Sequence, residues 1–364
     1  MKFNSYLNKI KEYVAGKPIE QIARDYQLNT KDIIKLGSNE NPYGPSPKVI
    51  QTLKQNSNSV HMYPDDSFYE LKSVLAKKFD VNENEIIFGC GSDQIIELAV
   101  RAKAKIGDNV LTAGLTFAMY KIAAQSVGAN LIKTDSLIHN LDELYTKYKK
   151  DNPSVIFLCL PNNPIGDCLD TDEVYSFLEK IDSETLVFVD GAYQEFASYK
   201  DKKKHIDIKD LINRFDNVVY SGTFSKLYGL GGMRIGYGIS KSKNLKALYK
   251  LRPPFNVASL SISAALSALE DEDYINEYLK HNLDQMKRYE DFIVSKGYSF
   301  VDSYTNFIQL EFKEDINSSV LASELMKRGI IIRDMSSYGI NGIRITIGTS
   351  LQNDIVLKNL DELL

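Results

Sequence analysis

Four short segments of the chain carry polar side chains of the kinds that hold a phosphate group and activate an amine. They are residues 89–94 (Gly-Cys-Gly-Ser-Asp-Gln), 161–166 (Pro-Asn-Asn-Pro-Ile-Gly), 190–193 (Asp-Gly-Ala-Tyr) and 222–226 (Gly-Thr-Phe-Ser-Lys). Each one follows a short apolar run that is typical of a β-strand. In open α/β sheets, ligands bind beyond the carboxyl ends of the strands. We therefore expect these four segments to meet at one edge of a sheet.

This set of side chains matches the chemical groups of pyridoxal phosphate. A lysine amine such as that of Lys226 forms a Schiff base with the aldehyde of the cofactor. An acid such as Asp190, placed against the pyridine nitrogen, keeps that nitrogen protonated and lets the ring accept electrons. An amide and a tyrosine hydroxyl suit the phenolic oxygen. Backbone N–H groups at a helix N-terminus, hydroxyls and an arginine suit the phosphate.

Each of these short patterns is weak by itself, and two of them suggest other chemistry. Gly89-x-Gly91 is two-thirds of a dinucleotide fingerprint, which would indicate a nicotinamide-dependent dehydrogenase, but Gln94 occupies the place of the third glycine. Thr223-x-x-Lys226 is similar to the Ser-x-x-Lys of β-lactam-binding enzymes, but no Lys-Thr-Gly follows it. The cofactor hypothesis depends on all the segments occurring in order after successive strands.

The elements that must position these side chains alternate along the middle of the chain. Strands are predicted at 86–88, 110–112, 131–133, 155–160, 186–189, 218–221 and 235–239, with amphipathic helices at 70–79, 94–104 and 172–181 among them. This alternation favours an α/β fold with a mostly parallel sheet and helices on both faces. The run 155–160 is apolar at every position, as in a strand that is buried on both sides.

The pattern changes after residue 258. A helical region at 259–296 precedes strand candidates at 307–312, 330–332 and 343–347, which indicates a smaller α+β domain. We therefore divide the chain into an N-terminal segment (1–30) that packs with the small domain, a large domain (31–258) and a small C-terminal domain (259–364). The first thirty residues are too short to be a domain.

Composition excludes several classes of function. The 364 residues carry a formal net charge of −4, so neither nucleic acid nor an anionic membrane surface is expected as a partner. No apolar run approaches the ~20 residues of a membrane span, and no signal peptide is evident. Three cysteines without a CxxC pair, and four histidines without ligand spacing, predict neither a disulfide framework nor a metal site. We expect a cytoplasmic protein.

Longer motifs resemble those of the fold-type I pyridoxal-phosphate aminotransferases, and most closely of the histidinol-phosphate aminotransferases. The resemblance covers nearly the whole chain. Its motifs are residues 38–44 (Ser-Asn-Glu-Asn-Pro-Tyr-Gly), 62–65 (Met-Tyr-Pro-Asp), 161–166, 223–226 (Thr-Phe-Ser-Lys) and 342–348 (Gly-Ile-Arg-Ile-Thr-Ile-Gly). It implies a large domain with a mostly parallel seven-stranded sheet flanked by helices, and a smaller α+β domain.

The resemblance also assigns roles to individual residues. Lys226 would hold the cofactor and carry the proton between Cα and C4′, Asp190 would face the ring nitrogen, and Tyr193 would complete the catalytic group. The implied cofactor contacts are Ser92, Asp93, Phe117, Asn163, Asp190, Tyr193, Thr223, Ser225, Lys226, Arg234 and Tyr63. The implied substrate contacts are Asn39, Tyr63, Asn163, Arg333 and Arg344. Tyr63 would reach the phosphate of a neighbouring subunit, which implies a homodimer with shared active sites.

Three departures from the family pattern concern the predicted site. The usual Asp-Glu-Ala-Tyr reads Asp-Gly-Ala-Tyr at 190–193, so the acid and the tyrosine are kept. The usual Pro-Thr-Tyr reads Leu-Thr-Phe at 115–117, so the ring that stacks on the cofactor lacks a hydroxyl. The usual Asn-Pro-Thr-Gly reads Asn-Pro-Ile-Gly at 163–166.

The reaction that the resemblance implies is amino-group transfer between L-histidinol phosphate and 2-oxoglutarate, with imidazole-acetol phosphate and L-glutamate as products. Within the class, an aromatic or aspartate aminotransferase and a threonine-phosphate decarboxylase remain alternatives, because the spacing of the motifs does not separate them. A cofactor-binding regulator would carry an additional DNA-binding domain, for which thirty N-terminal residues without a basic excess leave no room.

Overall fold

The computed structural model describes residues 1–10, 12 and 18–364, and its larger part is built on one seven-stranded sheet. The strands follow the order β2-β8-β7-β6-β5-β3-β4 across the sheet. They are β2 (Ile86–Gly89), β3 (Asn109–Thr112), β4 (Asn130–Lys133), β5 (Val155–Cys159), β6 (Leu186–Asp190), β7 (Val218–Thr223) and β8 (Gly236–Ile239). All neighbouring strands are parallel except β8, which is antiparallel to β2 and β7. The predicted fold class is confirmed.

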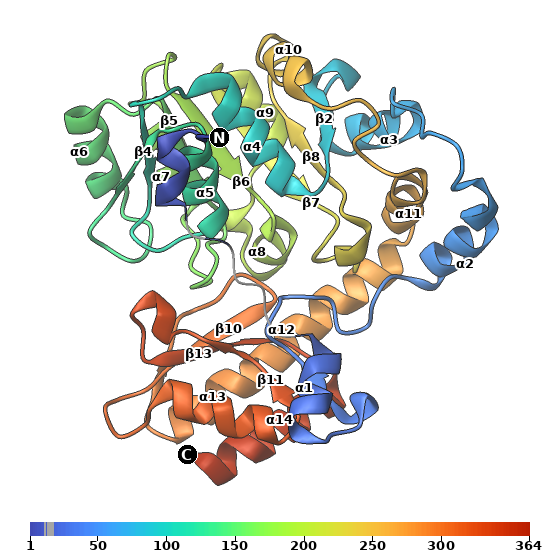
Figure 1. Cartoon of the computed structure of the whole chain (residues 1–364), viewed down its shortest axis with the longest axis vertical. Helices are drawn as coiled ribbons and strands as arrows, with labels where there is room; N and C mark the ends of the chain where they lie inside the picture. Colours follow the sequence, from blue (N-terminus) through green and yellow to red (C-terminus); the bar gives the residue numbers. More distant parts are fainter. Residues whose placement is uncertain (11, 13–17) are drawn as a thin grey trace.

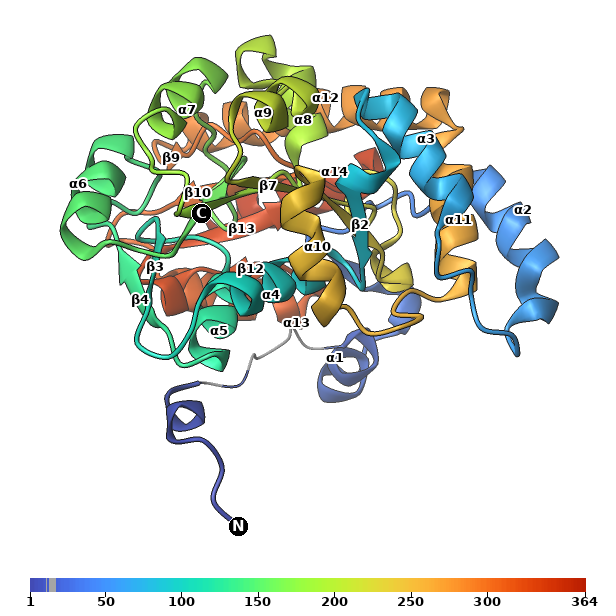
Figure 2. The same cartoon turned by 90° about the horizontal axis from the view of Figure 1, so that it is seen from above.

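Helices cover both faces of this sheet (Figures 1 and 2). One face packs against α4 (Ser92–Lys103), α5 (Ala118–Ser126) and α10 (Ser242–Leu251). The other packs against α2 (Pro47–Asn56), α3 (Tyr69–Phe79), α6 (Leu141–Asp151), α7 (Thr171–Leu178), α8 (Gln194–Lys200), α9 (Ile208–Arg214) and α11 (Ser259–Leu269). Alternate residues of β5 enter the two cores, with Phe157 on one side and Leu158 on the other. Burial on both faces explains why this strand is apolar throughout.

A smaller sheet lies below the large one in Figure 1. Its four antiparallel strands follow the order β12-β13-β10-β9, where β9 is Ser299–Phe300, β10 is Phe307–Glu311, β12 is Arg333–Asp334 and β13 is Gly342–Thr346. Apolar residues of this sheet share one core with α12 (Glu272–Ser295), α13 (Ser318–Lys327) and α14 (Ser350–Leu363). The predicted helical region 259–296 is two helices, α11 and α12, because the chain leaves the helix at residues 270–271.

The N-terminal residues divide between the two parts of the molecule. Helix α1 (Ile19–Tyr26) packs with residues of the small part, since Ile22 shares a cluster with Ile331. The segment Ser5–Lys9 contacts α5 of the large part, whereas we expected residues 1–30 to pack with the small domain. Strand β1 (Ile34–Lys35), which we assigned to the large domain, pairs in parallel with β11 (Ile330–Ile331) beside the small sheet. A two-residue strand gives no periodic signal, so the sequence could not place it.

None of the helices among the described residues combines the length and the apolar character that crossing a membrane requires.

Candidate active site

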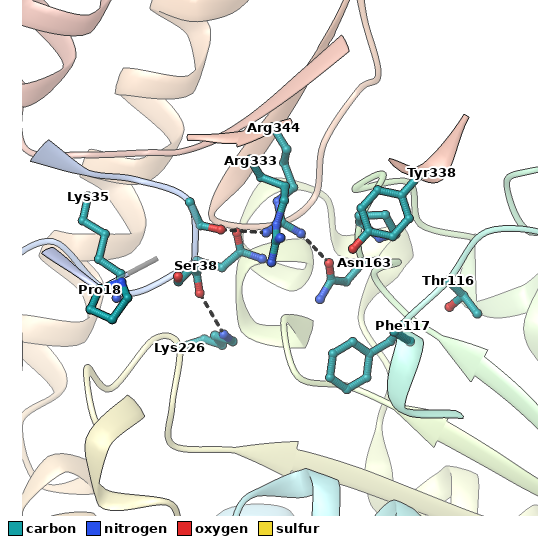
Figure 3. Close-up of a pocket in the computed structure, with 14 residues that line it drawn as sticks. Pro18, Lys35, Ser38, Thr116, Phe117, Asn163, Lys226, Arg333, Tyr338 and Arg344 are labelled. Atoms are coloured by element: carbon teal, nitrogen blue, oxygen red, sulfur yellow. Dashed lines mark hydrogen bonds between the residues drawn. The ribbon is translucent and has the colours of Figure 1, made fainter. Parts of the chain in front are cut away.

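The predicted site residues meet at the carboxyl edge of the large sheet, where it faces the small sheet. Two cavities adjoin there and share Phe117, Asn163 and Lys226 as lining residues. The inner cavity is about 100 Å³ and also contacts Ser92, Asp93, Asp190, Tyr193, Thr223, Ser225 and Arg234. The outer cavity is about 490 Å³ and also contacts Asn39, Arg333 and Arg344 (Figure 3). All the predicted residues except Tyr63 therefore line one of the two.

Lys226 lines both cavities at the place where they adjoin. The loop that carries it follows β7, and its ammonium lies 3.4 Å from the carbonyl oxygen of Ser38 (Figure 3). Burial, and then the positive charge of Arg344, lowers the pKa of Lys226 to about 8. Near neutral pH, a fraction of the molecules therefore carries a neutral Lys226 amine. The neutral amine is the form that acts as a nucleophile or accepts a proton.

Asp190 ends β6 and is held at the inner end of the smaller cavity. Its carboxylate accepts hydrogen bonds from the Tyr120 hydroxyl (2.7 Å), the Ser221 hydroxyl (3.1 Å) and the Ala192 N–H (3.2 Å). The carboxylate is 2% exposed, and among the described residues no cation pairs with it. Burial therefore raises its pKa, against the three donors that lower it. A cationic ring nitrogen opposite this carboxylate would compensate for that burial.

Tyr120 and Ser221 are site residues that sequence reasoning missed. Tyr120 is fully buried on α5, one turn after Phe117, so the i, i+3 spacing of two aromatic residues was the available signal. Ser221 lies one strand away from Asp190, at the same level in the register of β6 and β7. A register of that kind cannot be deduced from one sequence.

We expect Tyr120→Phe to weaken, but not to abolish, the stabilisation of the ionised Asp190 carboxylate by its hydrogen bonds. The variant deletes the shortest of the three hydrogen bonds, so the carboxylate should pick up a proton more readily. Loss of one charge-assisted hydrogen bond of about 1.5–3 kcal/mol predicts a fall in kcat of about tenfold or more. The measurement is the pH profile of kcat, whose acidic limb should move to higher pH. Ser126→Ala, on the same helix but outside the cavity lining, is the control; an unchanged profile for Tyr120→Phe would contradict this role.

A candidate anion site forms where β2 leads into α4. Helix α4 begins at Ser92, after Gly91 with φ of +74°. A Cβ on Gly91 would lie 2.6 Å from Nη2 of Arg234, so a larger residue would displace that guanidinium. Arg234 contacts the Ser225 hydroxyl (3.4 Å) and the Asp93 carboxylate (3.3 Å), and Thr223 donates to Ser225 (3.0 Å). A helix N-terminus, two hydroxyls and a guanidinium form an anion site.

Two arginines of the small sheet contribute positive charge to the outer cavity. Arg333 of β12 and Arg344 of β13 are direct cross-strand partners, and both reach toward Lys226 (Figure 3). Arg344 is only 6% exposed and donates to Oδ1 of Asn163 (2.7 Å) and to the Gly37 carbonyl (3.1 Å). Like charges placed opposite each other on a sheet are unfavourable. An anionic ligand between them offsets that cost, so the cavity is suited to carboxylates and phosphates.

Tyr193 and Asn39 connect the two parts of the molecule behind Lys226. The Asn39 amide donates to the Tyr193 hydroxyl at 2.8 Å, and the Asn39 N–H donates to the Thr346 hydroxyl at 2.9 Å. Tyr63, in contrast, lies on the surface with 81% of its area exposed, and it stacks on Phe255 at 4.6 Å between ring centroids. Its predicted contact with a neighbouring subunit stays a prediction.

The donors around the inner cavity match the chemistry of pyridoxal phosphate. They provide an amine for the aldehyde, a buried carboxylate for the ring nitrogen, and the anion site of α4 for the phosphate. The dinucleotide alternative does not fit, because within the described part of the chain β2 pairs only with the antiparallel β8 and so does not open a parallel βαβ unit. Among the described residues, no group of three or more His, Cys, Asp or Glu side chains is placed to hold a metal ion.

Comparisons with known proteins agree with this chemistry. Residues 31–360 match the model of the family described as aminotransferase class I and II. Two curated relatives are named histidinol-phosphate aminotransferase. That of Aliarcobacter butzleri is 51% identical over 364 residues, covering 100% of this chain and 99% of the relative. That of Sulfurimonas denitrificans is 52% identical over 358 residues, covering 98% of each.

Solved structures share the fold. Histidinol-phosphate aminotransferase from Sinorhizobium meliloti, in complex with pyridoxal-5'-phosphate, superposes with a TM-score of 0.89 at 24% identity, covering 100% of this chain and 98% of that one. L-threonine-O-3-phosphate decarboxylase from Porphyromonas gingivalis superposes with a TM-score of 0.76 at 24% identity, covering 91% and 99%. The family match and the full-length relatives at about half identity lead to one conclusion: the chain belongs to the class I and II aminotransferases and, within them, to the histidinol-phosphate aminotransferases.

Proposed function

We propose that the protein transfers an amino group between L-histidinol phosphate and 2-oxoglutarate, giving imidazole-acetol phosphate and L-glutamate, a step of histidine biosynthesis. Relatives named for this activity share half of its residues over its full length. The observation that carries the proposal is the cross-strand pair of Arg333 and Arg344 above Lys226. One cavity must accept a carboxylate in one half-reaction and a phosphate monoester in the other, and guanidinium groups bind both anions bidentately.

Pyridoxal phosphate is the cofactor we assign to the inner cavity. When bound, it supplies a sink for the electrons left behind when the substrate Cα loses its proton. Lys226 holds the cofactor at rest and then accepts and returns the proton at Cα, for which its lowered pKa suits it. Asp190 would hold the ring nitrogen in its charged form. Asn163 and Tyr193 would contact the phenolic oxygen, and Phe117 would pack on one side of the ring.

We assign Arg344 to bind the α-carboxylate of glutamate. This role can be tested separately from the binding of the cofactor. Arg344→Lys keeps the charge but loses the planar fork and its hydrogen bonds to Asn163 and Gly37. We expect the KM for glutamate to rise about 10- to 100-fold, which corresponds to the ~1.5–3 kcal/mol of a charge-assisted hydrogen bond. Steady-state kinetics measure this, with the exposed Arg214→Lys as the control. An unchanged KM would remove Arg344 from the carboxylate site.

The choice of substrate is tested by turnover with a panel of amino donors. The panel is L-histidinol phosphate, phenylalanine, aspartate and threonine phosphate, each with 2-oxoglutarate and the cofactor-loaded protein. We expect the largest kcat/KM for histidinol phosphate. Preference for phenylalanine or aspartate would make the protein an aromatic or aspartate aminotransferase. Release of CO₂ from threonine phosphate would make it a decarboxylase.

We further propose that the protein is a homodimer in which Tyr63 completes the phosphate site of the neighbouring subunit. Several apolar side chains near Tyr63 are exposed: Val60, Met62 and Tyr69 lie close to it in the sequence, and Phe255 stacks on its ring. A cluster of this kind is typical of a protein–protein contact. Sedimentation equilibrium should report twice the chain mass of 41.1 kDa, and a monomer with full activity would contradict the proposal. The cytoplasmic location stays a prediction.

A further inference from the structure

A second cavity lies on the other side of the loop that carries Lys226. It is about 540 Å³ and is bordered by α8, the start of α9, the end of α3 and the first turns of α12. Its inner wall contains Glu195 and three tyrosines, Tyr220, Tyr228 and Tyr237, and we call it the tyrosine cavity. It shares no lining residue with the inner and outer cavities of the active site.

Two glycines make room for the tyrosine hydroxyls. A Cβ on Gly191 would overlap the hydroxyl of Tyr220, and a Cβ on Gly222 would overlap that of Tyr237, each closer than real Cβ atoms approach their neighbours. Gly191 is the position where the family pattern has glutamate. The tyrosine cavity therefore accompanies a departure of this chain from that pattern, and a larger residue at 191 would displace Tyr220.

The polar atoms of the cavity have few partners within the protein. The rings of Tyr220, Tyr228 and Tyr237 are buried, yet among the described residues no hydrogen bond reaches their hydroxyls. Burial, and then the negative charge of Glu195, raises the pKa of Tyr228. Glu195 is partly open to the cavity, and burial raises its pKa to about 7, against a backbone hydrogen bond and the positive charge of Lys78, which both lower it. These four side chains form one electrostatically coupled group.

A neighbouring amide oxygen also lacks a donor. Gln194 is 5% exposed, and its NH₂ group donates to the Ser198 hydroxyl (3.1 Å) and to the Lys204 carbonyl (2.6 Å). Its Oε1 is buried without a hydrogen-bond partner, although Gln194 lines the cavity. Buried polar atoms are normally satisfied, so an orphaned acceptor beside a cavity indicates a missing donor.

We propose that the tyrosine cavity binds a small organic cation, a protonated amine carried on an apolar body. Its N–H group would donate to Glu195 and Gln194, and its charge would lie against the electron-rich faces of the tyrosine rings. Three lysines line the cavity, Lys78, Lys202 and Lys209, and a ligand would share Glu195 with Lys78, whereas Lys209 is paired with Asp80. The apolar body would pack on Phe79, Ile275 and Leu279.

The position of this site connects it to the active site. Consecutive residues face the two sites at three places: Tyr193 and Gln194, Ser221 and Tyr220, and Lys226 and Leu227. A ligand in the tyrosine cavity would therefore contact the rear of the segments that hold Asp190 and Lys226, without entering the substrate cavity.

The test uses N,N-dimethylbenzylamine, a tertiary amine that is protonated at neutral pH and cannot condense with an aldehyde. Isothermal titration of the cofactor-loaded protein should show saturable binding to one site per chain. Saturating 2-oxoglutarate should leave that binding unchanged. We expect Glu195→Gln to weaken it about tenfold or more, because the charged acceptor is lost. The exposed Glu184→Gln is the matched control, and benzyl alcohol is the neutral probe.

A second variant keeps the proposal open to contradiction if Glu195→Gln does not fold. Tyr228→Leu removes one ring but no charge, and we expect it to weaken binding about threefold or more. Absence of binding to the native protein would overturn the proposal. So would equal affinity for both Tyr228→Leu and the native protein, equal affinity for benzyl alcohol, or displacement by 2-oxoglutarate, which would place the probe in the substrate cavity.

Discussion

Replacing Lys226 with alanine should reduce kcat by at least about 10⁴-fold and remove the visible absorbance of the cofactor-loaded protein. The amine is assigned two tasks: it holds the cofactor, and it moves the proton at the substrate Cα. Proton transfer by a positioned group contributes about 10²–10⁴-fold by itself, and the loss of covalent attachment adds to that. The measurements are absorbance spectra before and after addition of L-histidinol phosphate, together with single-turnover kinetics.

Lys35 supplies a matched control for this experiment. It also lines the outer cavity, but its ammonium pairs with the Glu40 carboxylate at 2.7 Å. Lys35→Ala should keep the visible band and most of the activity. A Lys226→Ala protein that is folded, by circular dichroism, and retains both the band and the activity would refute the cofactor assignment and, with it, the proposed reaction.

Asp190→Asn should have the second largest effect, a fall in kcat of about 10³-fold or more with little change in fold. The amide has the shape of the carboxylate but no charge, so nothing would hold the ring nitrogen in its cationic form. The exposed Asp216→Asn serves as the control for the substitution itself. Retention of more than a tenth of kcat would show that the charge at position 190 is not required.

The same substitution should not destabilise the protein without cofactor. Burial raises the pKa of Asp190 above its unfolded value, so the native state disfavours the charged form. For a raised carboxyl pKa, the associated stability is present at low pH and is lost as the pH rises through that pKa. At pH 7 the carboxylate therefore costs stability, and Asp190→Asn should melt at the same temperature or higher. A large decrease in Tm would contradict this.

The sheet was predictable because its strands are apolar on both faces. Runs such as 155–160 and 218–221 are short, β-rich and bounded by turn residues, so their type and approximate limits follow from the sequence. The polar segments after them were predicted to meet because parallel strands end at a common edge. Strand β8 was predicted at 235–239, but its antiparallel direction was not, and the two-residue β1 was not predicted at all. Both depend on long-range pairing.

The lysine and the acid of the candidate site could be predicted from the sequence, but the contacts that support them could not. Asp190 and Lys226 belong to motifs with characteristic neighbours, whereas Tyr120 and Ser221 reach Asp190 only through the packing of α5 and the register of β7. The tyrosine cavity was equally invisible, because it depends on which side of β7 Tyr220 faces and on the space left by two glycines. Contacts between distant segments are set by tertiary packing, to which a single sequence gives no direct access.

The hydrogen bond between Arg344 and Asn163 fixes the orientation of the side-chain amide of Asn163. Oδ1 of Asn163 accepts from the guanidinium of the small sheet, so its NH₂ group is the end that would face the phenolic oxygen of the proposed cofactor. A substrate carboxylate that drew the guanidinium away would loosen that amide, and a more negative ring oxygen would tighten it. In the proposed reaction, substrate recognition and the electronic state of the cofactor would thus be linked through Asn163.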